Sequence, residues 1–121
     1  MRLAKWLRLS APILVLVAGS RCDLIEDKVM HRTPGEKLFN RLCSECHGEN
    51  GRGNTPRGIG NPSADLIDDN WKYGGDRGSI ERVISEGVFG EMPAHPELKP
   101  VEVRAIVDHL MKMRRANRGP S

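Results

Sequence analysis

The stretch Cys43-Ser44-Glu45-Cys46-His47 decides how this 121-residue sequence is interpreted. The apolar residues ahead of it, Leu38, Phe39 and Leu42, follow helical spacing and run into the motif. Positions three and four apart share one face of a helix, so both thiols and the imidazole are expected to approach one flat ligand together.

Two cysteines that are separated by two residues, with a histidine directly after the second cysteine, form the pattern of covalent haem attachment. The sequence therefore predicts one haem c, bound by thioethers through Cys43 and Cys46, with His47 coordinating the iron. A redox dithiol is one alternative, but it usually follows a strand in an α/β setting, and strand-like alternation of useful length is missing here. Half of a zinc site is another, but it needs a second Cys/His pair at suitable spacing. Neither alternative requires His47.

A second iron ligand is expected from the distal half of the chain, and Met92 in Gly90-Glu91-Met92-Pro93-Ala94 is the best candidate. Proline at 93 disfavours a helical conformation at Met92 and pushes it into an extended one, which lets a loop side chain reach a bound ring. Gap filling in the core is the alternative role for this methionine. His95 is the rival ligand, and we rank it below Met92.

The rest of the pattern predicts an all-α protein with long loops. Thr33 can cap a helix that has Pro34 in its first position, and Glu36 lies where a capping box requires it. Apolar spacing predicts a second helix over about 78–86 and a last helix over about 101–115, with a short helical turn within 63–70. We expect a domain at 33–116, followed by a basic C-terminal tail at 117–121. The basic cluster near this end is expected to be a solvated helix end and consists of Lys112, Arg114, Arg115 and Arg118.

The N-terminal residues have the pattern of an export signal. Arg2, Lys5 and Arg8 precede an apolar run over 9–18 and two small residues, Gly19 and Ser20. The run is about half of the roughly 20 apolar residues that cross a bilayer, so we expect a signal peptide at 1–20, followed by a polar linker at 21–32. The mature protein is then expected to be exported and periplasmic.

Cys22 follows the expected signal and has two interpretations. It is a candidate site for a lipid anchor that attaches the protein to a membrane, although arginine directly before such a cysteine is unusual. Cleavage after Ser20 would instead leave a free thiol near the new N-terminus. Intact mass distinguishes the two.

The charge of the chain does not favour a nucleic-acid partner. The 19 basic and 16 acidic residues give a formal charge of +3, and the three basic residues of the expected signal account for all of the excess. The rest of the chain is neutral overall, so its partners are expected to be redox proteins rather than nucleic acid.

Three segments in order resemble class I cytochromes c, over about residues 35–115. They are Cys43-Ser44-Glu45-Cys46-His47-Gly48, then Asp68-Asp69-Asn70-Trp71-Lys72-Tyr73-Gly74-Gly75, then Gly90-Glu91-Met92-Pro93-Ala94. The sequence is most similar to the cytochrome subunits of one class of bacterial terminal oxidase and to their free-standing relatives. This resemblance implies about three main helices around one haem whose edge reaches the surface, with His47 and Met92 as ligands.

The resemblance also assigns further roles by position. Gly35 and Phe39 match a crossing of the first and last helices, where the usual aromatic partner is replaced by His109. A backbone carbonyl is expected to accept the ring N–H of His47, with Pro62 and Ala64 as the two candidates.

The second segment of the resemblance suggests residues near the haem propionates. Trp71, Tyr73 and Arg77 are the candidates. Ordinary core packing of the two aromatic side chains and a solvated arginine are the alternatives.

These features predict a monomeric one-electron carrier that is not an enzyme and that exchanges electrons with a dehydrogenase, a reductase or a terminal oxidase. One alternative is a haem-bearing subunit of a larger oxidoreductase. Another is a haem sensor or enzyme that binds a gas or peroxide, which requires that Met92 is not a stable ligand.

Overall fold

A computed structural model describes residues 32–119, and these residues contain helices and no strand. The all-α prediction is therefore confirmed for this part of the chain. The expected signal peptide, all but the last residue of the expected linker, and Cys22 lie outside the described residues. The elements in chain order are α2 (Pro34–Leu42), α3 (Ser44–His47), the 3₁₀-helix η1 (Pro62–Ala64), α4 (Arg77–Glu86) and α5 (Pro100–Arg118).

Helix α2 begins as the sequence predicts. The Thr33 hydroxyl accepts a hydrogen bond from the Glu36 N–H at 3.2 Å, and Pro34 opens the helix. The helix ends at Leu42, and Cys43 lies between it and the four-residue helix α3. The attachment motif thus begins at the break between the two helices, and its other four residues form α3.

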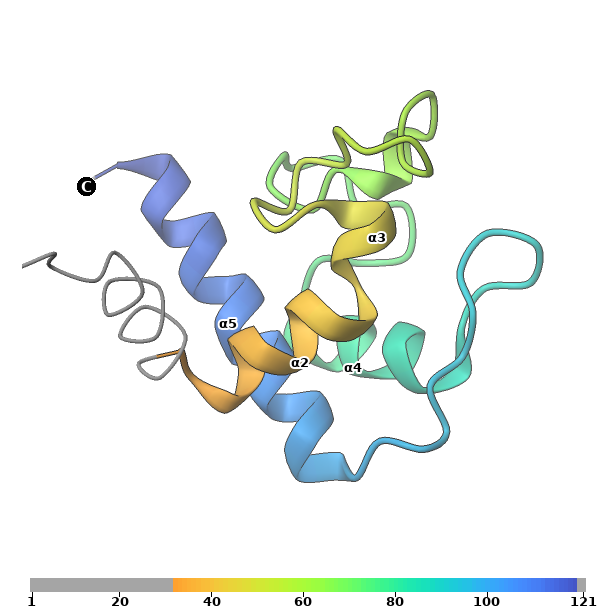
Figure 1. Ribbon diagram of the computed structural model, residues 1–121, viewed down its shortest axis with the longest axis vertical. Helices are drawn as coiled ribbons and strands as arrows, with labels where there is room; N and C mark the ends of the chain where they lie inside the picture. Colours follow the sequence, from red (N-terminus) through yellow and green to blue (C-terminus); the bar gives the residue numbers. More distant parts are fainter. Residues whose placement is uncertain (1–31, 120–121) are drawn as a thin grey trace, which may run out of the picture. The chain divides into compact units, whose positions relative to one another are not determined.

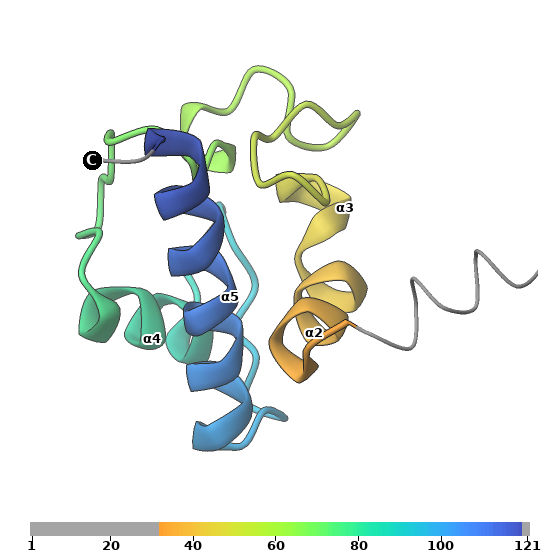
Figure 2. The same cartoon turned by 90° about the vertical axis from the view of Figure 1, so that its left-hand side faces the viewer.

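Helices α2 and α5 cross at close range, as Figures 1 and 2 show. A Cβ added to Gly35 would lie 2.0 Å from the Ala105 carbonyl oxygen, so only glycine permits this approach. One helical turn later, the rings of Phe39 and His109 lie 5.4 Å apart between their centroids. The predicted crossing, with histidine in place of the usual aromatic residue, is confirmed.

Helix α5 contributes more buried apolar side chains to the core than any other helix and extends further than predicted. Its buried apolar face packs against α2 and α4 (Figure 2). The buried apolar side chains of this cluster are Leu38, Phe39, Cys43, Ile80, Ile84, Val103, Ile106, Val107 and Leu110. Because α5 ends at Arg118, the expected tail at 117–121 begins inside the last helical turn.

The helical turn expected over 63–70 is shorter than predicted. Only η1, at 62–64, is helical, and the chain then bends. The Asp65 carboxylate accepts hydrogen bonds from the backbone N–H groups of Ile67 and Asp68, at 2.8 and 3.2 Å. This side chain takes backbone donors that a helix would otherwise use, and the helix is not continued.

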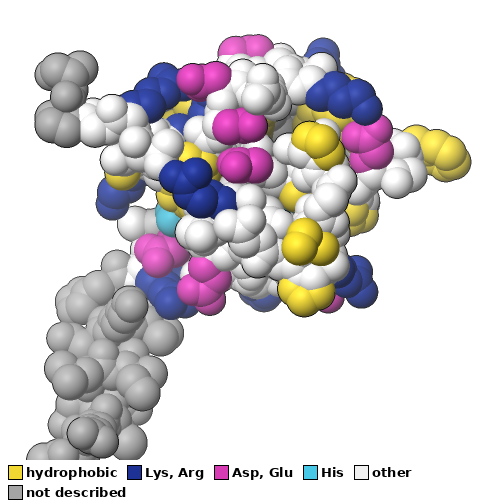
Figure 3. All heavy atoms as spheres, turned by 90° about the horizontal axis from the view of Figure 1, so that it is seen from above, with side chains coloured by type: hydrophobic (Ala, Val, Ile, Leu, Met, Phe, Trp, Pro, Cys, Tyr) yellow, Lys and Arg dark blue, Asp and Glu magenta, His cyan; other side chains and the backbone are white. Residues whose placement is uncertain are grey.

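The visible face in Figure 3 carries acidic and basic side chains side by side, with apolar side chains between them. Within residues 32–119, none of the helices combines the length and the hydrophobicity that a bilayer crossing requires.

Candidate cofactor site

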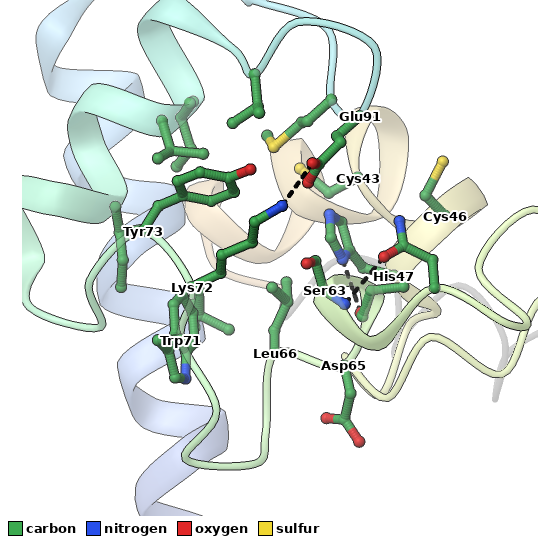
Figure 4. A pocket seen from close by; sticks show the side chains of 18 of the residues that line it. Cys43, Cys46, His47, Ser63, Asp65, Leu66, Trp71, Lys72, Tyr73 and Glu91 are labelled. Carbon is green, nitrogen blue, oxygen red and sulfur yellow. Dashed lines mark hydrogen bonds and ion pairs between the residues drawn. The ribbon is translucent and has the colours of Figure 1, made fainter.

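A large pocket opens between the two helices that flank Cys43, the loop after η1, helix α4 and the loop before α5. Its empty volume is about 1210 Å³, part of which is open to solvent, and its lining is mainly apolar. Figure 4 shows Cys43, Cys46 and His47 on one side of it and Trp71, Lys72 and Tyr73 on the other.

His47 is held by a carbonyl. Its Nδ1–H donates to the Ala64 oxygen at 2.8 Å, so Ala64, and not Pro62, is the acceptor. Helix α3 provides the histidine, and η1 presents the carbonyl. Burial lowers the pKa of His47, although the bond to Ala64 opposes this effect. The ring is therefore neutral at pH 7, with Nε2 available to a bound group, which is the form that coordinates metals.

The two thiols of the motif are free and unequal. Burial, and then the neighbouring Cys46, raise the pKa of Cys43 to about 11, while Cys46 is partly exposed. Nucleophilic cysteines of redox dithiols have lowered pKa values because they lie in electropositive surroundings. The environment of Cys43 is the opposite of this, and it weighs against a redox dithiol.

Met92 enters the same pocket from the distal loop. Backbone hydrogen bonds join Val88 and Met92 in both directions, at 2.8 and 2.9 Å, and close the loop between them. Gly87 has a φ of +70°, and a Cβ there would lie 2.7 Å from the Met92 oxygen, so glycine permits the close turn.

The rival residue His95 also lines the pocket. Its Nδ1 lies 2.9 Å from Glu97 Oε1, and its backbone N–H donates to the Ile84 oxygen at 3.0 Å. The structure therefore brings all four predicted site residues into one pocket and adds His95 to them.

Of the three residues expected near propionates, two line the pocket and one does not. Trp71 and Tyr73 line it. Trp71 gives its indole N–H to the Asp68 carbonyl at 2.9 Å, so this donor is already used. Arg77 lies elsewhere and forms an ion pair with Asp108 on α5. Its side chain is more than half exposed, which fits the alternative of a solvated arginine.

Arg114 differs from the expectation that the basic cluster at the end of the last helix is wholly solvated. Its side chain is buried, and its guanidinium carbon lies 4.5 Å from the centroid of the Trp71 ring. The sequence held a signal for this, because Arg114 follows Leu110 and Val107 by four and seven residues and so continues the buried stripe of α5.

Comparison with known proteins identifies the family. The family model described as cytochrome C oxidase, cbb3-type, subunit III, matches residues 32–110. The chain belongs to this family. It is a class I c-type cytochrome related to the cytochrome c subunits of oxidases, with haem c as its cofactor.

Curated relatives of this cytochrome are named as subunits of cbb3-type cytochrome c oxidases. Subunit FixP of Azorhizobium caulinodans is 42% identical over 73 residues, which are 60% of this chain and 24% of FixP. Subunit CcoP of Rhodobacter capsulatus is 33% identical over 86 residues, 64% of this chain and 28% of CcoP. Subunit CcoP of Rubrivivax gelatinosus is 32% identical over 105 residues, which are 85% of this chain and 33% of that CcoP. The chain thus spans about a quarter to a third of these relatives' length, and no solved structure gives a significant match.

The residues of the pocket fit haem c. Two thiols, a neutral imidazole with one nitrogen already committed to a carbonyl, and a thioether all line one mainly apolar space. Soft sulfur and imidazole are suited to haem iron, and a carbonyl bonded to the ring orients it.

Proposed function

We propose that this cytochrome is a one-electron carrier with a single haem, attached covalently through Cys43 and Cys46 and ligated by His47 and Met92. The observation that supports this most is that Met92, although distant in sequence from the attachment motif, lines the same pocket as Cys43, Cys46 and His47. The haem supplies an iron that alternates between two oxidation states.

The chain's own contribution is to fix the ligands and exclude water. The Ala64 carbonyl orients the His47 ring and increases its basicity. The loop closed between Val88 and Met92 holds the thioether at the pocket. A sulfur ligand in apolar surroundings favours reduced iron, so this pair of ligands raises the reduction potential above that of two histidines.

The partners in this proposal are redox proteins: a dehydrogenase, a reductase or a terminal oxidase. The names of the relatives favour a second form of the function, in which the chain is the haem-bearing part of a larger oxidoreductase. Co-purification of the native protein with a larger complex distinguishes this from a free monomeric carrier.

We propose the attachment edge near Cys43 and Cys46, together with the loop carrying Met92, as the docking patch. Because the chain without its expected signal is neutral overall, docking is weakly steered and mildly salt-dependent.

The basic N-terminal pattern supports export to the periplasm, and Cys22 is the proposed point of any lipid attachment. Intact mass of the mature protein tests both, since it reports the cleavage site and any lipid together.

The proposed function is tested by visible spectra of protein matured with periplasmic haem-attachment machinery, oxidised and reduced, with and without CO. The carrier is expected to give a c-type reduced spectrum, a weak sulfur-to-iron band when oxidised, and no change with CO. Prompt CO binding and loss of the sulfur band would favour a sensor or enzyme instead. Absence of covalent haem would refute the proposal.

A further inference from the structure

Arg114 lies behind the wall of the haem pocket and contacts it in three ways. Its side chain is 10% exposed. Nη1 donates to the Gly75 oxygen at 3.0 Å, and Nη2 reaches Asp69 Oδ1 at 3.4 Å. Its guanidinium carbon lies 4.5 Å from the centroid of the Trp71 ring, within the range of a cation–π contact.

These contacts hold residues 68–75, which we call the wall strip. Trp71 is fixed on three sides, since Arg114 covers its ring, its N–H donates to the Asp68 oxygen, and a Cβ on Gly75 would lie 2.9 Å from its Cγ. In Figure 4 the labelled side chains of the strip, Trp71, Lys72 and Tyr73, lie along one side of the pocket. A residue that fixes the strip therefore fixes this side of the pocket.

The charge of Arg114 is only partly neutralised. Asp69 is 78% exposed and lies closer to Arg118, at 2.6 Å, than to Arg114. The Nε of Arg114 is buried and has no hydrogen-bond partner in the structure. A buried cation near a redox centre favours the reduced state, because reduction removes one positive charge from the iron.

We propose that Arg114 is a positioning residue for the haem: it holds the wall strip in place through Trp71 and Gly75, and its buried charge raises the reduction potential. The inference rests on the proposed function, because it requires a haem that undergoes one-electron reduction in this pocket. Lysine cannot replace arginine here, since an ammonium group has neither the planar face that stacks on the indole nor the fork that reaches Gly75 and Asp69 together.

The test compares Arg114→Met, Arg114→Lys and the control Arg118→Met in the holoprotein. Arg118 also forms an ion pair with Asp69, but its side chain is exposed. The midpoint potential is measured by spectroelectrochemical titration. Hydrogen exchange of the Trp71 indole N–H is measured by nitrogen-resolved NMR of the reduced protein, with the signal assigned from Trp71→Phe.

Arg114→Met is expected to lower the reduced-to-oxidised ratio at fixed ambient potential about threefold, which is roughly 28 mV because 59 mV is tenfold for one electron. The same variant is expected to accelerate exchange of the Trp71 indole N–H about tenfold. Arg114→Lys is expected to accelerate indole exchange similarly but to shift the potential less, because the charge remains. Arg118→Met is expected to change the reduced-to-oxidised ratio and the indole exchange rate by less than about twofold each, because the loss of an exposed ion pair has a small effect.

Unchanged potential and indole exchange in Arg114→Met would overturn the inference. An equal potential shift in Arg114→Lys would overturn its electrostatic part. If Arg114→Met fails to mature, Arg114→Gln keeps one donor for the Gly75 oxygen and replaces it in both measurements. A wild-type protein without covalent haem or a reversible one-electron couple refutes the proposed function itself, and is recognised before any variant is measured.

Discussion

The Lys72 ammonium lies 2.7 Å from Glu91 Oε1 and so joins the two loops that face each other across the haem pocket. Lys72 belongs to the wall strip, and Glu91 directly precedes Met92. Figure 4 shows the lysine chain extending from the strip toward the carboxylate. The hydrogen bond between them lowers the pKa of Glu91 and raises that of Lys72. The pair is therefore charged at neutral pH.

Breaking this pair is expected to loosen the loop that carries Met92. Lys72→Gln or Glu91→Gln should increase the rate at which an external ligand such as imidazole displaces the methionine, by about two- to fivefold at low salt, since one exposed ion pair is lost. Stopped-flow ligand binding measures it. Because high salt screens the pair, wild type and variants should converge there. Equal rates at low salt would show that the pair does not hold the loop.

Much of the fold was predictable because the residues that begin a helix and the spacing of apolar residues indicate the same helices. Thr33 and Pro34 marked the start of α2, and the apolar stripes marked α4 and α5. The failures have specific causes. Asp65 takes backbone donors from the expected turn at 63–70, a local competition that apolar spacing does not reveal. The apolar spacing runs through the attachment motif and so did not show that one helix ends at Leu42 and another begins at Ser44.

The candidate site likewise has residues that the sequence predicts and contacts that it does not. Local motifs were enough to choose Cys43, Cys46, His47 and Met92, and all four line one pocket. The ion pair of Lys72 with Glu91 joins residues far apart in sequence, and no local sequence pattern predicts it. Burial of Arg114 was readable from helical spacing, but its neighbours in a basic run obscured it.

Replacing Gly35 is expected to separate α2 from α5. In Gly35→Ala the new methyl group would meet the Ala105 carbonyl at 2.0 Å, so the helices must move apart. Overpacking of this kind costs about 1–3 kcal/mol of the free energy of unfolding. Urea unfolding of the holoprotein measures the loss. Gly78→Ala is the control, because its nearest atom lies at 3.5 Å and alanine suits a helix, so this variant should be neutral or slightly more stable.

His109 makes stability depend on pH in a defined direction. Burial lowers its pKa, the charge of Glu36 opposes this, and Lys112 adds to it. The unfolded chain then binds more protons than the folded one just below the unfolded pKa of about 6.5. Stability due to this residue is full above that pH and is lost as the pH falls through 6.5 toward the lower folded value.

His109→Phe should flatten this dependence while keeping an aromatic ring against Phe39. It also removes a buried Nε2 that has no partner in the structure. Urea midpoints between pH 8 and 5 check the prediction. Identical slopes for variant and wild type would assign the titration to another group, whereas Glu36→Gln should steepen the slope by removing the opposing charge.

Met92 and His95 line the same pocket, but only the substitution of Met92 is expected to change the spectra and the reduction potential. Met92→Ala removes the proposed thioether, so the oxidised protein should lose its sulfur-to-iron band, and the reduced protein should bind CO promptly. The midpoint potential should fall, because thioether sulfur favours reduced iron. His95→Ala should leave band, CO response and potential as in wild type, since Glu97 already engages this ring. Visible spectroscopy and a redox titration measure all three. Persistence of the band in Met92→Ala would assign the sulfur ligand to another methionine. A wild type without the band, together with prompt CO binding in His95→Ala, would transfer the ligand role to His95.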